Sequence, residues 1–260
     1  MALSIQELFS ASDDAAEVLL SGAGEPLEVD ASESCFGQLV ELLMLKRGAP
    51  DRLTIRDRSQ RGALFRQLLA GTDPFCCVDG LGLYHAEPGS AETADEATDF
   101  AEHAQAALQS AGLQRSAAIR LSGVLHELLG NVDEHAGGHA TCLSGYSVQP
   151  GEAWLSVADT GDGVLAGYKS VPAGTRPMHA REALRWAVLE HRSRTGLPGR
   201  GTGFQTVANA LRSLDASLRV RSDEGSIELS QSGSEAQAVV REQAHLRGFV
   251  VSINLRWALP

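Results

Sequence analysis

Three short clusters of polar residues and glycines have types and spacings that suit chemistry, and the first lies in residues 127–135. At 3.6 residues per helical turn, Glu127, Asn131 and His135 would stack on one face of a helix. A carboxylate can polarise water, an amide oxygen can complete the coordination shell of magnesium, and an imidazole can donate to phosphate oxygens. The same spacing is typical of a solvated helix face, so the cluster alone leaves both interpretations open.

The second cluster is Asp159, Gly161 and Gly163, directly after a predicted strand at 153–157. An aspartate at a strand end presents a fixed hydrogen-bond acceptor. The two glycines permit positive φ and close approach of the backbone to a flat ligand. An ordinary glycine turn with a surface aspartate is the alternative interpretation.

The third cluster lies immediately before a predicted helix at 204–214. It consists of Gly199, Arg200, Gly201, Thr202 and Gly203. Closely spaced glycines before a helix expose several backbone N–H groups to an anion at the positive end of the helix dipole, so a phosphate fits there. The cluster lacks the Lys-Ser or Lys-Thr of the Walker pattern and the preceding strand of the dinucleotide fingerprint. A flexible linker is the alternative.

The order and separation of the three clusters resemble the ATP-binding fold shared by DNA gyrase, heat-shock chaperones, histidine kinases and mismatch-repair proteins, the GHKL group. Residues 127–135 match its N box, Asp159 to Gly163 its G1 box, and Gly199 to Gly203 its G2 box. The resemblance covers residues 100–260. It implies a Bergerat-type α/β sandwich, in which helices cover a mixed sheet, with ATP and Mg²⁺ as cofactors.

The resemblance also implies roles for single residues. Glu127 would be the catalytic residue that orients or deprotonates the nucleophile, and Asn131 would ligate magnesium. His135 would contact a phosphate. Asp159 would accept a hydrogen bond from the adenine amino group, above a pocket floor shaped by the glycines of the G1 box. The loop from Gly199 to Gly203, with Arg200 and Thr202, would bind the phosphates.

Departures from the family narrow the expected function. A histidine kinase has a phospho-accepting histidine in a two-helix domain upstream of the N box, and no such pattern precedes residue 100. His126 lies inside the N box itself. The sequence also shows no second transducer domain like that of gyrase or the chaperones. Small bacterial regulators that phosphorylate a serine on a partner protein, often one that controls a sigma factor, are the remaining neighbours.

We therefore predict a Mg-ATP-binding regulatory protein, either a serine-directed protein kinase or a slow ATPase. A non-catalytic module whose partner binding is gated by nucleotide is the alternative, and a degenerate pocket is a third possibility. A protein partner is expected, and a homodimer is possible.

The elements that would position these clusters divide the chain in two. Residues 1–90 are predicted to form a smaller αβ regulatory domain, weakly similar to anti-sigma-antagonist (STAS) domains, and residues 91–99 a linker. In the first part strands are expected at 26–30, 52–56 and 75–78, and helices at 36–47 and 62–70. In the second part helices are expected at 100–111, 116–136, 178–191 and 204–214. Strands there are expected at 141–148, 153–157, 218–220, 226–229 and 249–255.

Two segments of the second part are less regular. Residues 164–195 would form a lid over ATP, partly irregular and mobile. The sequence leaves residues 231–247 open between a helix packed on the sheet, an inserted loop and a dimer contact.

Composition excludes several other functions. The chain has 260 residues and a formal net charge of -11, so it would repel phosphate backbones and anionic lipids, and we expect neither nucleic acid nor membrane as partner. No apolar run reaches the ~18 residues of a membrane helix and no signal-peptide pattern begins the chain, which favours the cytoplasm. The cysteines lack C-x-x-C spacing and are predicted to be buried free thiols.

Overall fold

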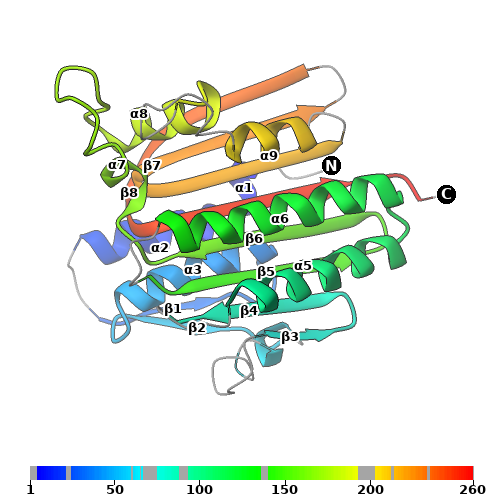
Figure 1. Cartoon of the computed structure of the whole chain (residues 1–260). Helices are drawn as coiled ribbons and strands as arrows, with labels where there is room; N and C mark the ends of the chain where they lie inside the picture. Colours follow the sequence, from blue (N-terminus) through cyan, green and yellow to red (C-terminus); the bar gives the residue numbers. More distant parts are fainter. Residues whose placement is uncertain are drawn as a thin grey trace.

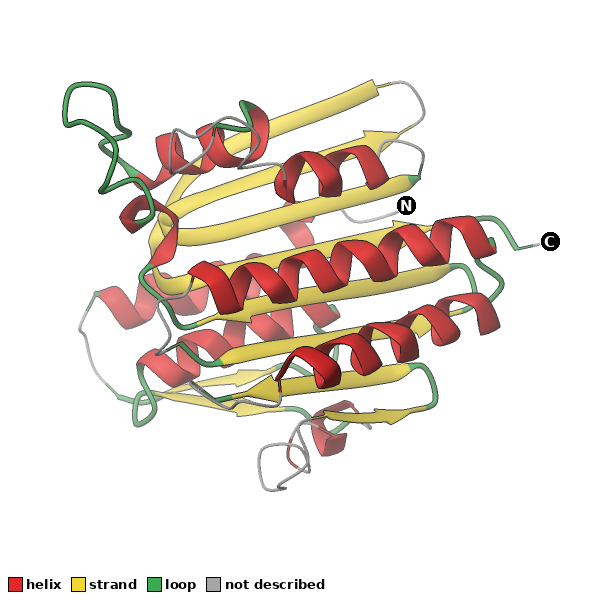
Figure 2. Cartoon of the chain, viewed as in Figure 1, coloured by secondary structure: helices red, strands yellow, loops and turns green. Residues whose placement is uncertain are grey.

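The computed structural model describes residues 5–21, 25–59, 61–64, 66, 75–87, 93–135, 140–192, 203–211, 214–232 and 235–259. A six-stranded sheet in the order β3, β4, β5, β6, β8, β7 forms its centre, with helices on both faces (Figure 1 and Figure 2). The chain is an α/β protein, as predicted. The expected mixed sheet is wrong for this central sheet, because every neighbouring pair in it is antiparallel.

The strands follow the period-2 pattern of the sequence. They are β1 (Leu27–Asp30), β2 (Leu53–Arg56), β3 (Phe75–Val78), β4 (Leu81–Ala86), β5 (Cys142–Gln149), β6 (Glu152–Asp159), β7 (Asp215–Ser232) and β8 (Glu235–Arg256). In β6, Leu155 and Val157 pack on one face and Trp154 and Ala158 on the other, because successive side chains alternate. Both faces of the sheet are therefore covered, which explains why nearly all of β6 is buried.

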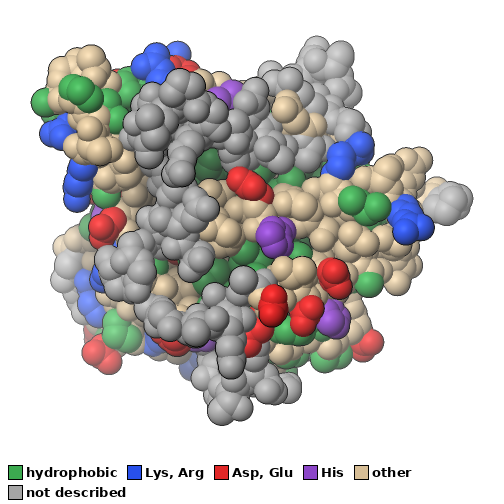
Figure 3. All heavy atoms as spheres, viewed as in Figure 1, with side chains coloured by type: hydrophobic (Ala, Val, Ile, Leu, Met, Phe, Trp, Pro, Cys, Tyr) green, Lys and Arg blue, Asp and Glu red, His purple; other side chains and the backbone are tan. Residues whose placement is uncertain are grey.

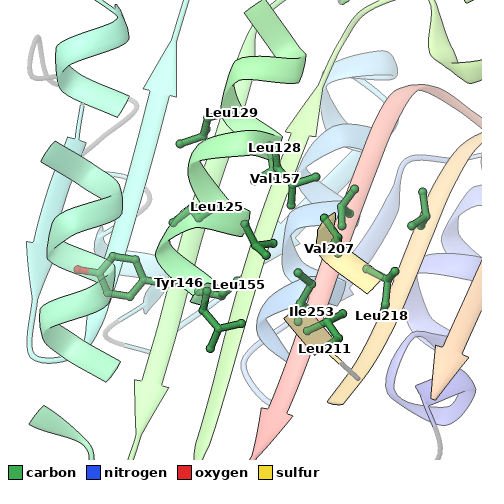
Figure 4. Close-up of a cluster of buried hydrophobic side chains, with 14 of the residues drawn as sticks. Leu125, Leu128, Leu129, Tyr146, Leu155, Val157, Val207, Leu211, Leu218 and Ile253 are labelled. Carbon is green, nitrogen blue, oxygen red and sulfur yellow. The ribbon is translucent and has the colours of Figure 1, made fainter. Parts of the chain in front are cut away.

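Helices α5 (Thr93–Ser110), α6 (Arg115–His135) and α9 (Gly203–Leu211) lie on one face, called here the α6 side (Figure 1). Leu125, Leu128 and Leu129 of α6 recur at helical spacing and are buried against this face. Figure 4 shows α6 close to the strands that carry Tyr146 and Val157, β5 and β6. The central helix and strand that carry the first two clusters are thus fixed by one apolar core.

Helices α1 (Ile5–Leu8), α2 (Ser10–Leu20) and α3 (Phe36–Gly48) belong to the opposite side, called here the α3 side. There α3 buries Leu39 and Leu42 in a core that includes Trp154 and Ala158 of β6. Strands β1 and β2 flank α3 in sequence and pair in parallel as a separate sheet. Strand β4 pairs with β5, so residues on both sides of the boundary expected at 91–99 share the central sheet.

Most predicted elements are confirmed, with four differences. Helix α5 begins at Thr93, so most of the expected linker is helical. Strand β4, and helices α1 and α2, were not predicted. The helix expected at 62–70 is described only at residues 61–64 and 66, which are helical, and its remainder lies outside the described residues.

The fourth difference is in the closing strands, which form one long hairpin, β7 and β8, instead of three short strands. The segment left open at 231–247 contributes the first half of β8 from Glu235 onward. Register shifts fall between Ser222 and Asp223 and between Asp223 and Gly225. Such bulges bend a strand, and here they mark the point where the hairpin turns away from the central sheet.

Among the described helices, none is both long and apolar enough to cross a membrane. All four cysteines are free, as predicted, but only Cys142 is buried, whereas Cys35, Cys76 and Cys77 are half-buried.

Candidate functional site

The two flanks of α6 face different neighbours. Ser122 Oγ donates to the carbonyl of Ala101 at 2.9 Å, and His126 Nε2 lies 3.3 Å from Thr98 Oγ1, so this flank faces α5. At about 100° per residue, Glu127 and Asn131 fall on the opposite flank. Helix α9 packs against α6 on that flank (Figure 1). Glu127 is exposed and Asn131 is half-buried.

Helix α9 begins at Gly203, the last glycine of the third cluster. Gly199, Arg200, Gly201 and Thr202 lie outside the described residues. His135 is the last residue of α6, and its side chain lies outside the described part as well. The structure therefore puts the end of the third cluster on the helix that adjoins the Glu127 flank.

Asp159 is the last residue of β6 and is only 7% exposed. Its Oδ1 accepts a hydrogen bond from the Gly161 N–H at 2.8 Å, which closes a tight turn after the strand. Figure 4 shows Leu128 of α6 beside Val157, two residues before Asp159. The last turns of α6, which carry Asn131, therefore lie over the strand end that carries Asp159.

The partners of Asp159 across the sheet are Cys142 on β5 and Phe249 on β8. Directly opposed residues of antiparallel strands project from the same face, so all three side chains point to the α6 side. Burial raises the pKa of the Cys142 thiol, and the negative charge of Asp159 raises it further. Cross-strand pairing identifies these neighbours, and no sequence motif predicts them.

Gly163 occupies a position that other residues would strain. Its φ is 78°, and a Cβ there would lie 2.6 Å from Asp223 Oδ1. Asp223 belongs to the bulge of β7, and its Oδ2 accepts from the Leu165 N–H at 3.4 Å. The preceding Ser222 Oγ accepts from the Val164 N–H at 2.9 Å. Gly163 thus lets the turn after β6 dock on the bent hairpin, a role that sequence reasoning missed because it depends on a distant strand.

The segment expected to be a lid is described from residue 164 to 192. It forms α7 (Gly163–Ala166), α8 (Ala180–Leu184) and a π-helical turn, η1 (Arg185–Leu189). Buried Tyr168 donates from its hydroxyl to the Arg192 carbonyl at 3.0 Å, and the Arg192 guanidinium lies 4.2 Å from the centre of the Trp186 ring. Part of the expected helix at 178–191 is confirmed by α8 and η1. The described segment is anchored on its own aromatic residues.

Acidic side chains outnumber basic ones among the described exposed residues of α5 and α6. Asp99, Glu102 and Glu127 are exposed there, and so are Arg115 and Arg120 in the first half of α6; Figure 3 shows acidic and histidine side chains over α5 and α6. Among the described residues, no three His, Cys, Asp or Glu side chains are grouped so as to hold a metal ion. Asn131, half-buried on α6, carries an uncharged amide oxygen of the kind that can coordinate a hard cation.

The described residues fit the chemistry of an adenine nucleotide: a buried acceptor at the end of β6, and an amide and a carboxylate on the neighbouring flank of α6. Asn131 with phosphate oxygens and water would suit magnesium, which keeps several waters in such sites. No protein-family model matches the chain, and no curated protein matches its sequence.

Proposed function

We propose that this protein binds Mg-ATP in a Bergerat-type α/β sandwich and acts in bacterial signal transduction or transcription control. In the bound state it would transfer phosphate to a serine of a partner protein or hydrolyse ATP slowly. The observation that carries the proposal is the position of Asp159, a buried carboxylate at a central strand end, beneath the turns of α6 that bear Asn131.

The part of the site that would hold the adenine ring, called here the base end, is supported by the chemistry of Asp159. An ionised carboxylate only accepts hydrogen bonds, so it favours a ring with an exocyclic amino group, as in adenine, over one with a carbonyl at that position. Because the carboxylate is nearly removed from water, a ring with a carbonyl at that position would place a second acceptor against it, which is unfavourable.

The phosphate end of the site is supported by the position of α9, which begins at Gly203 and packs against α6. The exposed acids on the α6 side would repel a triphosphate, so a cation is needed to bring the phosphates near Glu127. Magnesium, when bound, would offset the phosphate charge, and Asn131 would hold it. Glu127 is exposed on the flank nearest α9, where it can orient a water or a serine hydroxyl as a general base.

A nucleotide-gated binding module without catalysis is the second candidate, and the contacts of the lid favour it. The backbone N–H of Leu165 donates to Asp223 in the bulge of the hairpin. A Cβ on Gly225 of the hairpin would lie 2.9 Å from the backbone nitrogen of Arg181 in α8, so the two segments are in close contact. The same hairpin reaches α2 and α3 through Arg219, which binds Asp13 and Glu41. A change in the lid therefore has a contact route to the N-terminal helices, and differential contacts alone suffice to shift a population.

Isothermal titration of ATP into the protein with and without magnesium tests the binding proposal. Asp159→Asn should abolish binding, because an amide can present its N–H₂ group to the ring in place of an acceptor. Asp162→Asn, three residues along the same turn and exposed, is the matched control and should bind normally. Wild-type protein that gives no binding heat in either condition would refute the proposal.

Turnover separates the two candidates. Labelled ATP is incubated with the protein alone and with candidate partners, and transfer and hydrolysis are followed for wild type and Glu127→Gln. Glu102→Gln, an exposed glutamate on neighbouring α5, is the control. Loss of turnover in Glu127→Gln alone supports the enzyme. Binding without turnover in any variant, together with a partner affinity that depends on ATP, supports the gated module.

A further inference from the structure

Phe249 lies directly across from Asp159 on β8, as Cys142 does on β5. Opposed residues in an antiparallel pair have Cβ atoms about 4.5–5.5 Å apart and project from the same face. The carboxylate is therefore flanked on the α6 side by a thiol and an aromatic ring. Neither of these two neighbours is a cation, and Asp159 Oδ1 also accepts from the Gly161 N–H at 2.8 Å.

The Phe249 ring also contacts α9. Its centroid lies 5.8 Å from that of Phe204, and the two rings meet at 70°, the edge-to-face arrangement that aromatic pairs prefer. Phe204 is the second residue of α9, directly after Gly203. Both rings are half-buried. One aromatic pair thus connects the strand beside Asp159 with the first turn of the helix that follows the glycine cluster.

A carboxylate beside an aromatic ring suits a particular ligand chemistry. A flat heteroaromatic ring that donates an amino hydrogen to Asp159 brings its apolar surface next to Phe249. Aromatic contacts of this kind add roughly 0.5–1.5 kcal/mol beyond area burial, which makes the ring a selective neighbour for a base.

We propose that Phe249 contacts the nucleotide base and fixes its position against Asp159, and that Phe204 holds the Phe249 ring in place. This inference rests on the proposed nucleotide binding and adds a residue to the base end of that site. Phe249 is then a ligand-contacting residue, whereas Phe204 is a positioning residue that acts through it.

The test measures the dissociation constant of Mg-ATP by isothermal titration for wild type, Phe249→Leu, Phe249→Tyr, Phe204→Leu and the double leucine variant. Phe249→Leu should weaken binding by about three- to tenfold, the affinity equivalent of the aromatic contact. Phe249→Tyr keeps the ring and should restore binding to within about twofold of wild type. Phe204→Leu should weaken binding, and the double variant should bind no more weakly than Phe249→Leu, because Phe204 acts through Phe249.

Phe75→Leu is the matched control. Phe75 lies on the edge strand β3, is half-buried, and its ring centroid is 6.2 Å from that of Phe100. It should lose stability like the other leucine variants and keep the affinity for ATP. If Phe249→Leu does not fold, Phe204→Leu tests the same ring from the helix.

Each outcome separates this inference from the proposed function. Wild-type protein that fails to bind ATP removes both. Wild-type binding that Asp159→Asn abolishes, with unchanged affinity in Phe249→Leu, overturns the role of Phe249 alone. Multiplicative effects of the two leucine substitutions overturn the positioning role of Phe204.

Discussion

Arg219 Nη1 lies 2.6 Å from Glu228 Oε1, although the two residues are nine positions apart in the same strand, β7. Nine residues of straight strand span about 30 Å, so β7 must fold back on itself between them. The bulge at Asp223 provides the bend, with φ 52° at Asp223 and 88° at Gly248 on the partner strand. The buried arginines of β7 are thereby enclosed between the two arms of the hairpin and helices α2 and α3.

Glu41 of α3 is central to this buried charge network. Its Oε1 accepts from Arg219 Nε at 2.8 Å and its Oε2 from Arg221 Nη1 at 3.1 Å, with all three side chains fully buried. Burial by itself would raise the pKa of Glu41, but the two guanidinium groups outweigh it and lower that pKa. Glu41→Gln leaves buried positive charge uncompensated and should cost about 3–5 kcal/mol of unfolding free energy, measured in urea.

The control for Glu41→Gln is Glu28→Gln. Glu28 pairs with Arg56 at 2.7 Å, but both side chains are about half exposed, so the loss should stay below about 1 kcal/mol. Equal losses in the two variants would show that the buried network does not hold α3 to the hairpin.

Gly163→Ala should destabilise the protein by about 1–3 kcal/mol, because the new Cβ would require a left-handed backbone and meet the Asp223 carboxylate. Urea unfolding without nucleotide measures this effect apart from ligand binding. Gly174→Ala is the control, since nothing lies within 4 Å of a Cβ there. A harmless Gly163→Ala would mean that the turn after β6 does not depend on its contact with the hairpin.

His85 should make stability depend on pH. Burial lowers the pKa of His85 and the nearby Arg47 lowers it further, while Glu87 opposes them. Arg47 Nη2 lies 2.7 Å from His85 Nε2, a contact in which the neutral ring accepts. In the unfolded chain, His85 binds a proton below about pH 6.5. The stability that the neutral ring contributes to the folded protein is therefore complete above that pH and is lost as pH falls through the folded pKa.

The measurement is the unfolding free energy between about pH 7 and pH 5, the range in which histidines titrate. As pH falls, the unfolding free energy should decline less in His85→Gln than in wild type. In His126→Gln, at an exposed position on α6, it should decline as in wild type. Identical pH profiles for wild type and His85→Gln would exclude this contribution.

Asn131→Asp should change the magnesium dependence of ATP binding. A new carboxylate near the phosphates repels them by about 1 kcal/mol even in water, so affinity without magnesium should fall at least about fivefold. Affinity with saturating magnesium should fall less, because the cation offsets the charge. Gln114→Glu makes the same change at an exposed position before α6 and should leave both affinities unaltered. A uniform loss in both conditions would argue against a role of Asn131 at the metal.

The sequence by itself determined the local elements of the candidate site. The helical period of apolar residues predicts α6, and alternation predicts β5 and β6, so the sequence alone predicts Asn131 on a helix and Asp159 at a strand end. These signals are local, because they record which side of an element is apolar.

Only the tertiary structure decided which elements lie side by side. Periodicity does not say that Phe249 is opposite Asp159, that Asp223 fills the space beside Gly163, or that α3 covers the second face of the sheet. The bend of β7 is equally hidden, because Arg219 and Arg221 at alternate positions look like the solvated side of an edge strand. Their partners Asp13 and Glu41 lie far away in the chain. Long-range charge pairing and cross-strand register therefore determine this arrangement.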